Sequence, residues 1–193
     1  MVTGTGFSNA FASPEVGAPA PAFTGMTSKG ESVSLESLRG KTVVLEWTNH
    51  DCPYGRKHYG SGKMQAIQKN SATDGIVWLS IISSAPGRQG FVEVDEANQL
   101  TSSRDAAPTH VILDPQGSVG QAYSARTTPH MFVIDPDGTL QYKGGIDDKP
   151  SSSKRSLEGA HNYVCAALAD LKAGKPVANP VSRPYGCSVR YST

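Results

Sequence analysis

The chain has 193 residues, and its 18 lysines and arginines nearly balance 17 aspartates and glutamates, for a formal net charge of +1. This length can bury the core of one ordinary domain, and no basic stripe suited to nucleic acid appears. No apolar run approaches the roughly 20 residues of a membrane-spanning helix. Composition and charge therefore point away from a nucleic-acid partner and from a membrane span.

The N-terminal residues are rich in Gly, Thr and Ser and are not expected to pack. Ala10-Phe11-Ala12, followed by Ser13, has the small-x-small pattern found at the cleavage site of secretory signals. We therefore predict that residues 1–17 are disordered or are the remnant of a signal peptide. The pattern favours export, to the periplasm in a bacterium, with a cytoplasmic location as the alternative. Three cysteines fit either compartment.

The next residues alternate strand and helix patterns. Strands are predicted at 22–23, 32–34, 42–48, 76–82 and 111–113, and a hairpin at 131–134 and 140–142 around Asp135-Pro136-Asp137-Gly138. Helices are predicted from residue 52 to about 70 with a break near 60–62, and at 91–103, 118–123 and 157–172. These elements define an α/β domain over residues 18–174. Residues 175–193 hold three prolines and are predicted to form an extended tail.

The strongest chemical signal is a cysteine between a strand and a helix. The apolar run at 42–48 leads through a short polar loop to Cys52-Pro53, and proline suits the first turn of a helix. A thiol at a helix N-terminus lies against unpaired N–H groups and the positive end of the dipole, which favour the thiolate. Arg56, Lys57 and His58 add positive or titratable groups nearby. We therefore interpret Cys52 as a nucleophile, with a buried inert cysteine as the alternative.

This stretch resembles the active-site turn of the thioredoxin superfamily. In Cys52-Pro53-Tyr54-Gly55, Gly55 stands where the second cysteine of that motif would be, and Glu46 stands where thioredoxin keeps its buried acid. Residues 127–134 are similar to the cis-proline loop and the strand that follows it. From about Pro19 to Gly145 the chain resembles the peroxiredoxin-like redoxin (AhpC/TSA-related) branch. The resemblance implies a thioredoxin-like fold, with a central mixed sheet flanked by helices.

The resemblance also implies roles for individual residues. Thr128 and Pro129 would be joined by a cis peptide bond and form the substrate-binding edge, with Pro53, Tyr54 and Gly55 beside them. Glu46 would accept the proton of the sulfur or of the leaving thiol. His130 follows the proline, and whether it faces the sulfur or the strand stays open. No cofactor is implied.

Release of a mixed disulfide needs a second thiol. Cys187, within Gly186-Cys187-Ser188 near the C-terminus, is the internal candidate for that resolving thiol, because related redoxins carry a similar ending. An external thiol reductant, a plain free thiol or a pairing of Cys187 with Cys165 are the alternatives. Cys165 lies between inner-face positions of a predicted helix and is expected to fill the core or its boundary.

The predicted activity is thiol–disulfide exchange, or thiol oxidation sensing, with protein or small-molecule thiols and disulfides as partners. Peroxide reduction with an antioxidant role is the second hypothesis. Counting back from Cys52, however, Asn49 and Leu45 replace the threonine and proline of the peroxiredoxin motif. A copper-handling site at His50, Cys52 and His58, and a binding module without catalysis, are the remaining alternatives.

Overall fold

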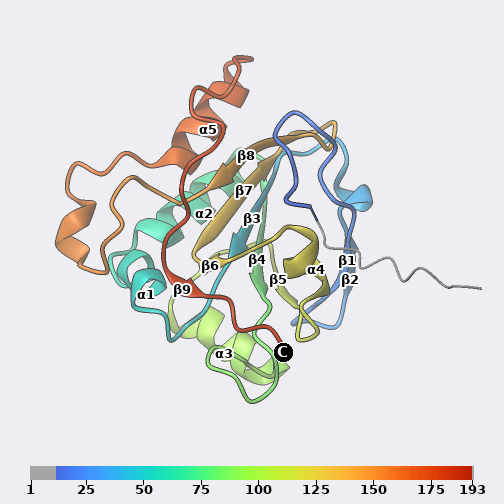
Figure 1. The fold of residues 1–193 in the computed structure, drawn as a ribbon, viewed down its shortest axis with the longest axis vertical. Coiled ribbons are helices and arrows are strands. Elements are labelled where there is room, and N and C mark those ends of the chain that lie inside the picture. The colour runs from blue at the N-terminus through green and yellow to red at the C-terminus, as the bar shows by residue number, and fades with distance from the viewer. Residues whose placement is uncertain (1–11, 193) are drawn as a thin grey trace, which may run out of the picture.

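The structure is a computed structural model that describes residues 12–192. Its centre is a mixed seven-stranded sheet with helices on both faces (Figure 1). The strands follow each other across the sheet in the order β2 (Ser32–Ser34), β1 (Thr24–Thr27), β5 (His110–Leu113), β4 (Val77–Ile82), β3 (Val43–Trp47), β7 (His130–Ile134) and β8 (Leu140–Gly144). The three central strands β3, β4 and β5 are parallel, and the outer strands pair antiparallel.

The connections between strands carry the helices. The α-helices are α1 (Pro53–Tyr59), α2 (Lys63–Thr73), α3 (Val94–Ser103), α4 (Ser118–Ala122) and α5 (Tyr163–Lys172), and single 3-10 turns occur as η1 (Glu36–Leu38) and η2 (Lys154–Leu157). A second, two-stranded sheet joins β6 (Thr127–Thr128) to β9 (Cys187–Ser188). None of the helices in residues 12–192 has the length and hydrophobicity that a membrane span needs.

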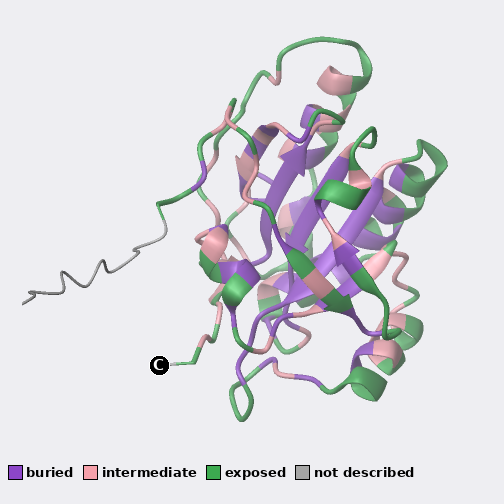
Figure 2. Ribbon diagram, turned by 90° about the vertical axis from the view of Figure 1, so that its right-hand side faces the viewer, coloured by how far each residue is buried: buried purple, intermediate pink, exposed green. Residues whose placement is uncertain are grey.

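Strand β3 separates two apolar layers, because successive side chains of a strand point to opposite faces. Val43, Leu45 and Trp47 pack with residues of β7 and α4 on one face. Val44 packs on the other face with Trp78 and with residues of α1, α2 and α5. All of β3 and β4 is buried, and the sheet forms the buried interior of the molecule in Figure 2. Strand β3 is thus packed on both faces, and the loop that follows it leads to α1.

Most predicted elements are found, with shifted ends. The predicted break in the first helix is confirmed: α1 ends at Tyr59, and Gly62, with φ 75°, begins α2 in a left-handed conformation that glycine adopts readily. Helix α3 begins at Val94 instead of 91, and Val94 is exposed. The first edge strand occupies 24–27 instead of 22–23.

The last helix begins later than predicted. Residues 154–157 form a 3-10 turn, and α5 starts at Tyr163, where the Asn162 side chain accepts a hydrogen bond from the Cys165 N–H at 2.8 Å. The inner face of the helix is then set by Val164 and Ala167. Cys165 is exposed, so the expectation that it fills the core or its boundary is wrong.

Residues 180–191, called here the C-terminal segment, return across the domain. The Lys143 N–H donates to the Pro180 carbonyl at 3.0 Å, β9 pairs antiparallel with β6, and the Ala85 N–H donates to the Arg190 carbonyl at 2.8 Å. In Figure 1 this segment passes α1 and β6 before it reaches the C-terminus. The described N-terminal part also contacts the domain, since the Gly17 N–H donates to the Leu140 carbonyl at 2.8 Å. Residues 10 and 11 of the predicted cleavage site lie outside the described residues, and the predicted domain limits stay predictions.

Candidate functional site

Cys52 occupies the N-cap position of α1, directly after the loop that leaves β3. Pro53 is the first helical residue, as the sequence predicts. The Cys52 N–H donates to the Asn49 carbonyl at 3.1 Å, and its carbonyl accepts the Arg56 N–H at 2.8 Å, so the backbone on both sides of the sulfur is fixed. The side chain of Cys52 is 0% exposed. This sulfur therefore lies beneath other parts of the chain.

The two segments that cover Cys52 are β6 and β9. The Thr128–Pro129 peptide bond is cis, and the Cys52 thiol donates to the Thr128 carbonyl at 3.0 Å. Thr128 lies opposite Cys187 in the β6–β9 register, and the Cys52 and Cys187 thiols lie close enough for each to shift the pKa of the other. Cys52, Thr128 and Cys187, which are far apart in the sequence, thus lie close together in the structure.

The surroundings shift the pKa values of the two thiols in opposite directions. Burial raises the pKa of Cys52, but the contacts with Cys187, with the Thr128 side chain and with the Gly55 backbone favour its thiolate, and the net result is a lowered pKa. For Cys187, burial comes first and the contact with Cys52 adds to it, so its pKa is raised to about 12. Of the two thiols, Cys52 is therefore the one that ionises first, and Cys187 is the one that keeps its proton.

The rest of the predicted substrate edge is partly covered. Pro53 is exposed, Tyr54 is half-buried and Gly55 is buried. The ring of Tyr54 meets the ring of Tyr185 edge to face, with 5.8 Å between centroids. The C-terminal segment thus lies over the same residues to which the resemblance assigns substrate binding.

Glu46 does not contact Cys52 through a hydrogen bond within residues 12–192. Its carboxylate accepts hydrogen bonds at 2.9–3.4 Å from four side chains, those of Tyr59, Gln68, Trp78 and Ser80. We call these five residues the Glu46 cluster. The cluster lies between β3, β4, α1 and α2, so Glu46 joins the sheet to its helices. The proton transfer predicted between Glu46 and the Cys52 sulfur is not provided by these hydrogen bonds.

The positions of the histidines do not support a copper site at His50, Cys52 and His58. His130 points into the protein: burial lowers its pKa to about 3, with Arg126 and Lys143 adding to the effect, and its Nδ1 accepts the Arg126 N–H at 3.2 Å. His50 lies 3.4 Å from the carboxylate of Asp51. Nowhere in residues 12–192 do three or more histidine, cysteine or acidic side chains gather as a metal site would require.

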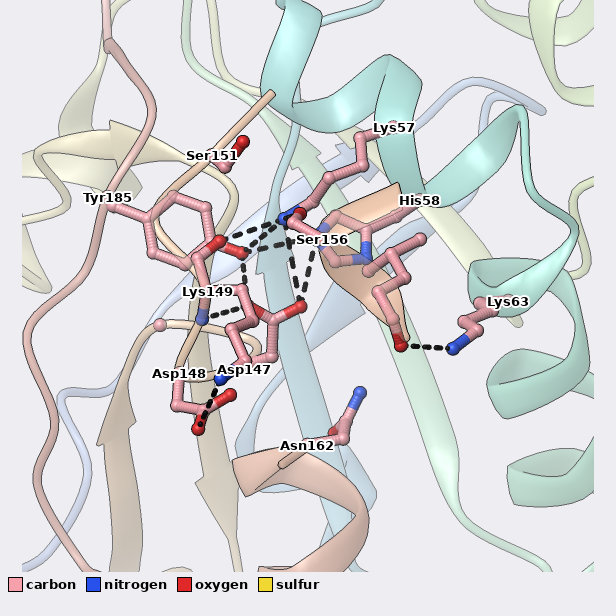
Figure 3. A network of polar contacts seen from close by, with 12 residues as sticks. Lys57, His58, Lys63, Asp147, Asp148, Lys149, Ser151, Ser156, Asn162 and Tyr185 are labelled. Carbon is pink, nitrogen blue, oxygen red and sulfur yellow. Dashed lines mark hydrogen bonds and ion pairs between the residues drawn. The ribbon is translucent and has the colours of Figure 1, made fainter. Parts of the chain in front are cut away.

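A second buried polar group lies beneath the C-terminal segment and was missed in the sequence. It consists of Lys57, His58, Asp147 and Tyr185, which we call the Asp147 cluster (Figure 3). The Tyr185 hydroxyl donates to Asp147 Oδ1 and lies 3.1 Å from the Lys57 Nζ, which is 3.8 Å from Asp147 Oδ2. Burial lowers the pKa of Lys57, and Asp147 opposes that shift.

One signal in the sequence was available for this cluster. Tyr185 precedes Cys187 by two residues, and residues two apart in an extended chain point to the same side. A cysteine expected to face Cys52 therefore implied an inward tyrosine. No comparable pattern marks Asp147, because its partners come from distant parts of the chain.

The sheet order, the cis proline and a cysteine at the start of the first α-helix define a thioredoxin-like redoxin. Residues 16–143 match the AhpC/TSA family, so the chain belongs to that family. The match ends before the C-terminal segment. Among curated proteins, no match to this chain is found.

Several solved structures share the fold. A hypothetical protein from Sinorhizobium meliloti 1021 has a TM-score of 0.81 and 20% identity, and 94% of this chain aligns with 97% of that one. An uncharacterized conserved protein from Geobacillus kaustophilus has a TM-score of 0.78 and 21% identity, over 95% and 94% of the two chains. A putative thiol:disulfide interchange protein DsbE from Chlorobium tepidum has a TM-score of 0.56 and 22% identity, over 68% and 85%. At these identities the likeness establishes the fold.

Proposed function

We propose that this protein is a thiol–disulfide oxidoreductase in which Cys52 is the attacking sulfur and Cys187 resolves the intermediate. The observation that carries the proposal is the position of Cys187: it lies opposite Thr128, whose carbonyl accepts the Cys52 thiol hydrogen bond, and the pKa values of the two thiols are shifted in opposite directions. A thiolate next to a neutral thiol is the arrangement that exchange with an internal partner requires. The family match supports the same chemistry.

The proposed reaction has two steps. The Cys52 thiolate attacks one sulfur of a partner disulfide, and the other partner sulfur leaves as a thiolate that takes up a proton. Cys187 then loses its proton and attacks the Cys52 sulfur of the mixed disulfide, which releases the second partner thiol. The partner disulfide is reduced to two thiols, and Cys52 and Cys187 are oxidised to one disulfide. An external thiol reductant restores the two cysteines by the reverse exchange.

The described conformation is a closed one. Since Cys52 is 0% exposed, a partner reaches it only when the C-terminal segment moves away from β6. The second step, by contrast, needs the segment in place. The proposed cycle therefore alternates between a released and a seated C-terminal segment.

The test compares three cysteine variants in glutathione redox buffers, with mass spectrometry of the crosslinked peptides. We expect the wild-type protein and Cys165→Ser to form a Cys52–Cys187 disulfide and to reduce a small disulfide. Cys187→Ser should accumulate the mixed disulfide at Cys52, and Cys52→Ser should lose the activity. If the wild-type protein forms no crosslink, and Cys52 resists alkylation near neutral pH, the proposal is wrong.

Peroxide reduction is the second candidate, favoured by the AhpC/TSA family match. In that reaction the Cys52 thiolate attacks a peroxide oxygen and forms a sulfenic acid, the alcohol or water leaves, and Cys187 condenses with the sulfenic acid to a disulfide and water. Asn49, at the threonine position, is buried, and its side-chain oxygen accepts the Asp51 N–H at 2.9 Å. Peroxide consumption faster than disulfide reduction under the same conditions would reverse our preference.

We also propose that the protein acts outside the cytoplasm, on the basis of the Ala10-Phe11-Ala12 pattern and the use of a disulfide as substrate. Fractionation of cells that express the natural gene should recover the protein outside the cytoplasmic membrane. Recovery in the cytosolic fraction would contradict this location.

A further inference from the structure

We infer that Tyr185 is a positioning residue for the resolving step: its hydroxyl, held between Lys57 and Asp147, anchors the C-terminal segment so that Cys187 faces Cys52. This inference rests on the proposed function, because it concerns how the resolving thiol is delivered. Tyr185 itself does not touch either sulfur through a hydrogen bond in the described residues. It acts through the backbone of Gly186 and Cys187.

The anchor is made by charged groups from two elements that do not belong to the segment. Lys57 comes from α1, the helix that Cys52 begins, and Asp147 comes from the loop after β8. The side chains of Lys57 and Asp147 are 0% and 2% exposed. The Lys57 ammonium also lies 5.0 Å from the centre of the Tyr185 ring. A hydroxyl held by a buried charge pair is a strong attachment, because hydrogen bonds to charged groups exceed those between neutral groups.

The attachment helps to position the cysteine because a single residue, Gly186, separates Tyr185 from Cys187 and lies directly against β6. Gly186 has a φ of 137°, and a Cβ built on it would lie 2.1 Å from the Thr128 carbonyl oxygen. The segment therefore runs in direct contact with β6, and Tyr185 and Cys187 both face inward. Moving Tyr185 moves Cys187.

The C-terminal segment borders a cavity next to the Asp147 cluster. A cavity of about 550 Å³ opens beside it and is lined by Asp148, Tyr163 and Tyr185 among others. The Tyr185 hydroxyl adds a polar attachment at this edge of the segment. The anchor also sets the fraction of molecules in which Cys52 is exposed. The same contact therefore speeds the attack of Cys187 on the mixed disulfide and slows the reaction of Cys52 with outside partners.

The experiment measures two quantities in Tyr185→Phe, which loses only the hydroxyl and keeps the ring beside Tyr54 and Lys57. In glutathione redox buffers, the effective concentration of Cys187 toward Cys52 should fall about 10-fold to 100-fold, the factor for one hydrogen bond to a charged group. In a Cys187→Ser background, alkylation of Cys52 should accelerate about as much, since the anchor no longer holds the segment over the sulfur. A purely structural role would change neither quantity at temperatures where the variant is fully folded.

Two further variants complete the design. Tyr163→Phe is the matched control, since Tyr163 faces the same cavity and its hydroxyl has no hydrogen-bond partner among residues 12–192; it should leave both quantities unchanged. Lys57→Met removes the anchor from the other side, and its effect should not add to that of Tyr185→Phe.

An unchanged effective concentration in Tyr185→Phe, while the wild-type protein forms the disulfide, would overturn the inference alone. Absence of the disulfide in the wild-type protein would overturn the proposed function with it.

Discussion

The Glu46 cluster and the Asp147 cluster share a buried carboxylate that accepts a tyrosine hydroxyl, and they differ in which parts of the chain they connect. Each places a buried carboxylate under a tyrosine hydroxyl, Tyr59 for Glu46 and Tyr185 for Asp147. All members of the Glu46 cluster come from residues 46–80, within adjacent strands and helices of the core. The Asp147 cluster joins α1, the loop after β8 and the C-terminal segment.

The difference separates stability from function. Breaking the Glu46 cluster requires the sheet to part from α1 and α2, which amounts to unfolding. Releasing Tyr185 from the Asp147 cluster requires only that the C-terminal segment leave, while the sheet stays intact. Buried polar groups in the same protein can thus hold the scaffold together or hold a movable part in place, and the connections of their members decide which.

The largest effect is expected for Glu46→Ala. The substitution leaves the Tyr59 hydroxyl, the Trp78 indole N–H and the Ser80 hydroxyl buried without their acceptor. Each orphaned donor has a desolvation cost, and the free energy of unfolding should fall by about 3–5 kcal/mol. Urea denaturation measures this change.

The matched control is Glu158→Ala, which removes an exposed carboxylate and should change the free energy of unfolding by less than about 0.5 kcal/mol. If Glu46→Ala is no more destabilised than this control, the Glu46 cluster does not hold the scaffold. If it instead releases Cys52 to alkylation without a loss of stability, the two clusters have exchanged roles.

An intermediate effect is expected for Gly186→Ala. The added methyl group would lie 2.1 Å from the Thr128 carbonyl oxygen, so β9 cannot keep its pairing with β6. The segment should detach while the sheet and the Glu46 cluster stay folded, and the free energy of unfolding should fall by about 1–3 kcal/mol. Cys52 should become open to alkylation, and the Cys52–Cys187 disulfide should form more slowly.

Gly174→Ala separates the clash from backbone strain. Gly174 also has a positive φ, of 68°, but no atom lies within 4 Å of a Cβ built there. It should lose stability through strain alone and keep Cys52 protected. Equal protection of Cys52 in Gly186→Ala and Gly174→Ala would show that the segment does not cover the sulfur.

The same contrast explains what could be predicted from the sequence. The apolar runs that became β3 and β4 and the turn at Cys52-Pro53 are local patterns, and local patterns were enough to predict the thioredoxin-like core. The sequence predicts an earlier start for α5 because the apolar Leu157 fits the helical period, although it belongs to a 3-10 turn in the structure.

The candidate site was predictable only in part. Cys52, Thr128 and Cys187 came from a motif and a family resemblance, whereas Lys57 and Asp147 meet through contacts between distant segments. No periodicity marks such contacts. A charged residue on a helix is usually solvated, so the burial of Lys57 follows from the path of the C-terminal segment and not from the sequence around it.

The smallest effect at neutral pH is expected for His58→Gln, because the contacts of His58 in the Asp147 cluster are long, 3.4 Å to the Tyr185 hydroxyl and 3.7 Å to Asp147 Oδ2. The free energy of unfolding at pH 7 should change by less than about 1 kcal/mol. The pH dependence should change more. Burial lowers the pKa of His58 from 6.5 to about 4, Asp147 opposes the shift, and Lys57 and Lys63 add to it.

The sign of that pH dependence follows from proton binding. Between about pH 4 and 6.5 the unfolded chain binds a proton at His58 that the folded protein does not, so the stability contributed by neutral His58 is present above pH 6.5 and is lost as the pH falls toward 4. His58→Gln should therefore flatten the slope of unfolding free energy against pH in this window, by up to about 1.4 kcal/mol per pH unit. His161→Gln, at an exposed histidine, controls for the substitution. A steeper slope in His58→Gln would mean that Asp147 holds His58 protonated, and that acid fastens the C-terminal segment instead of loosening it.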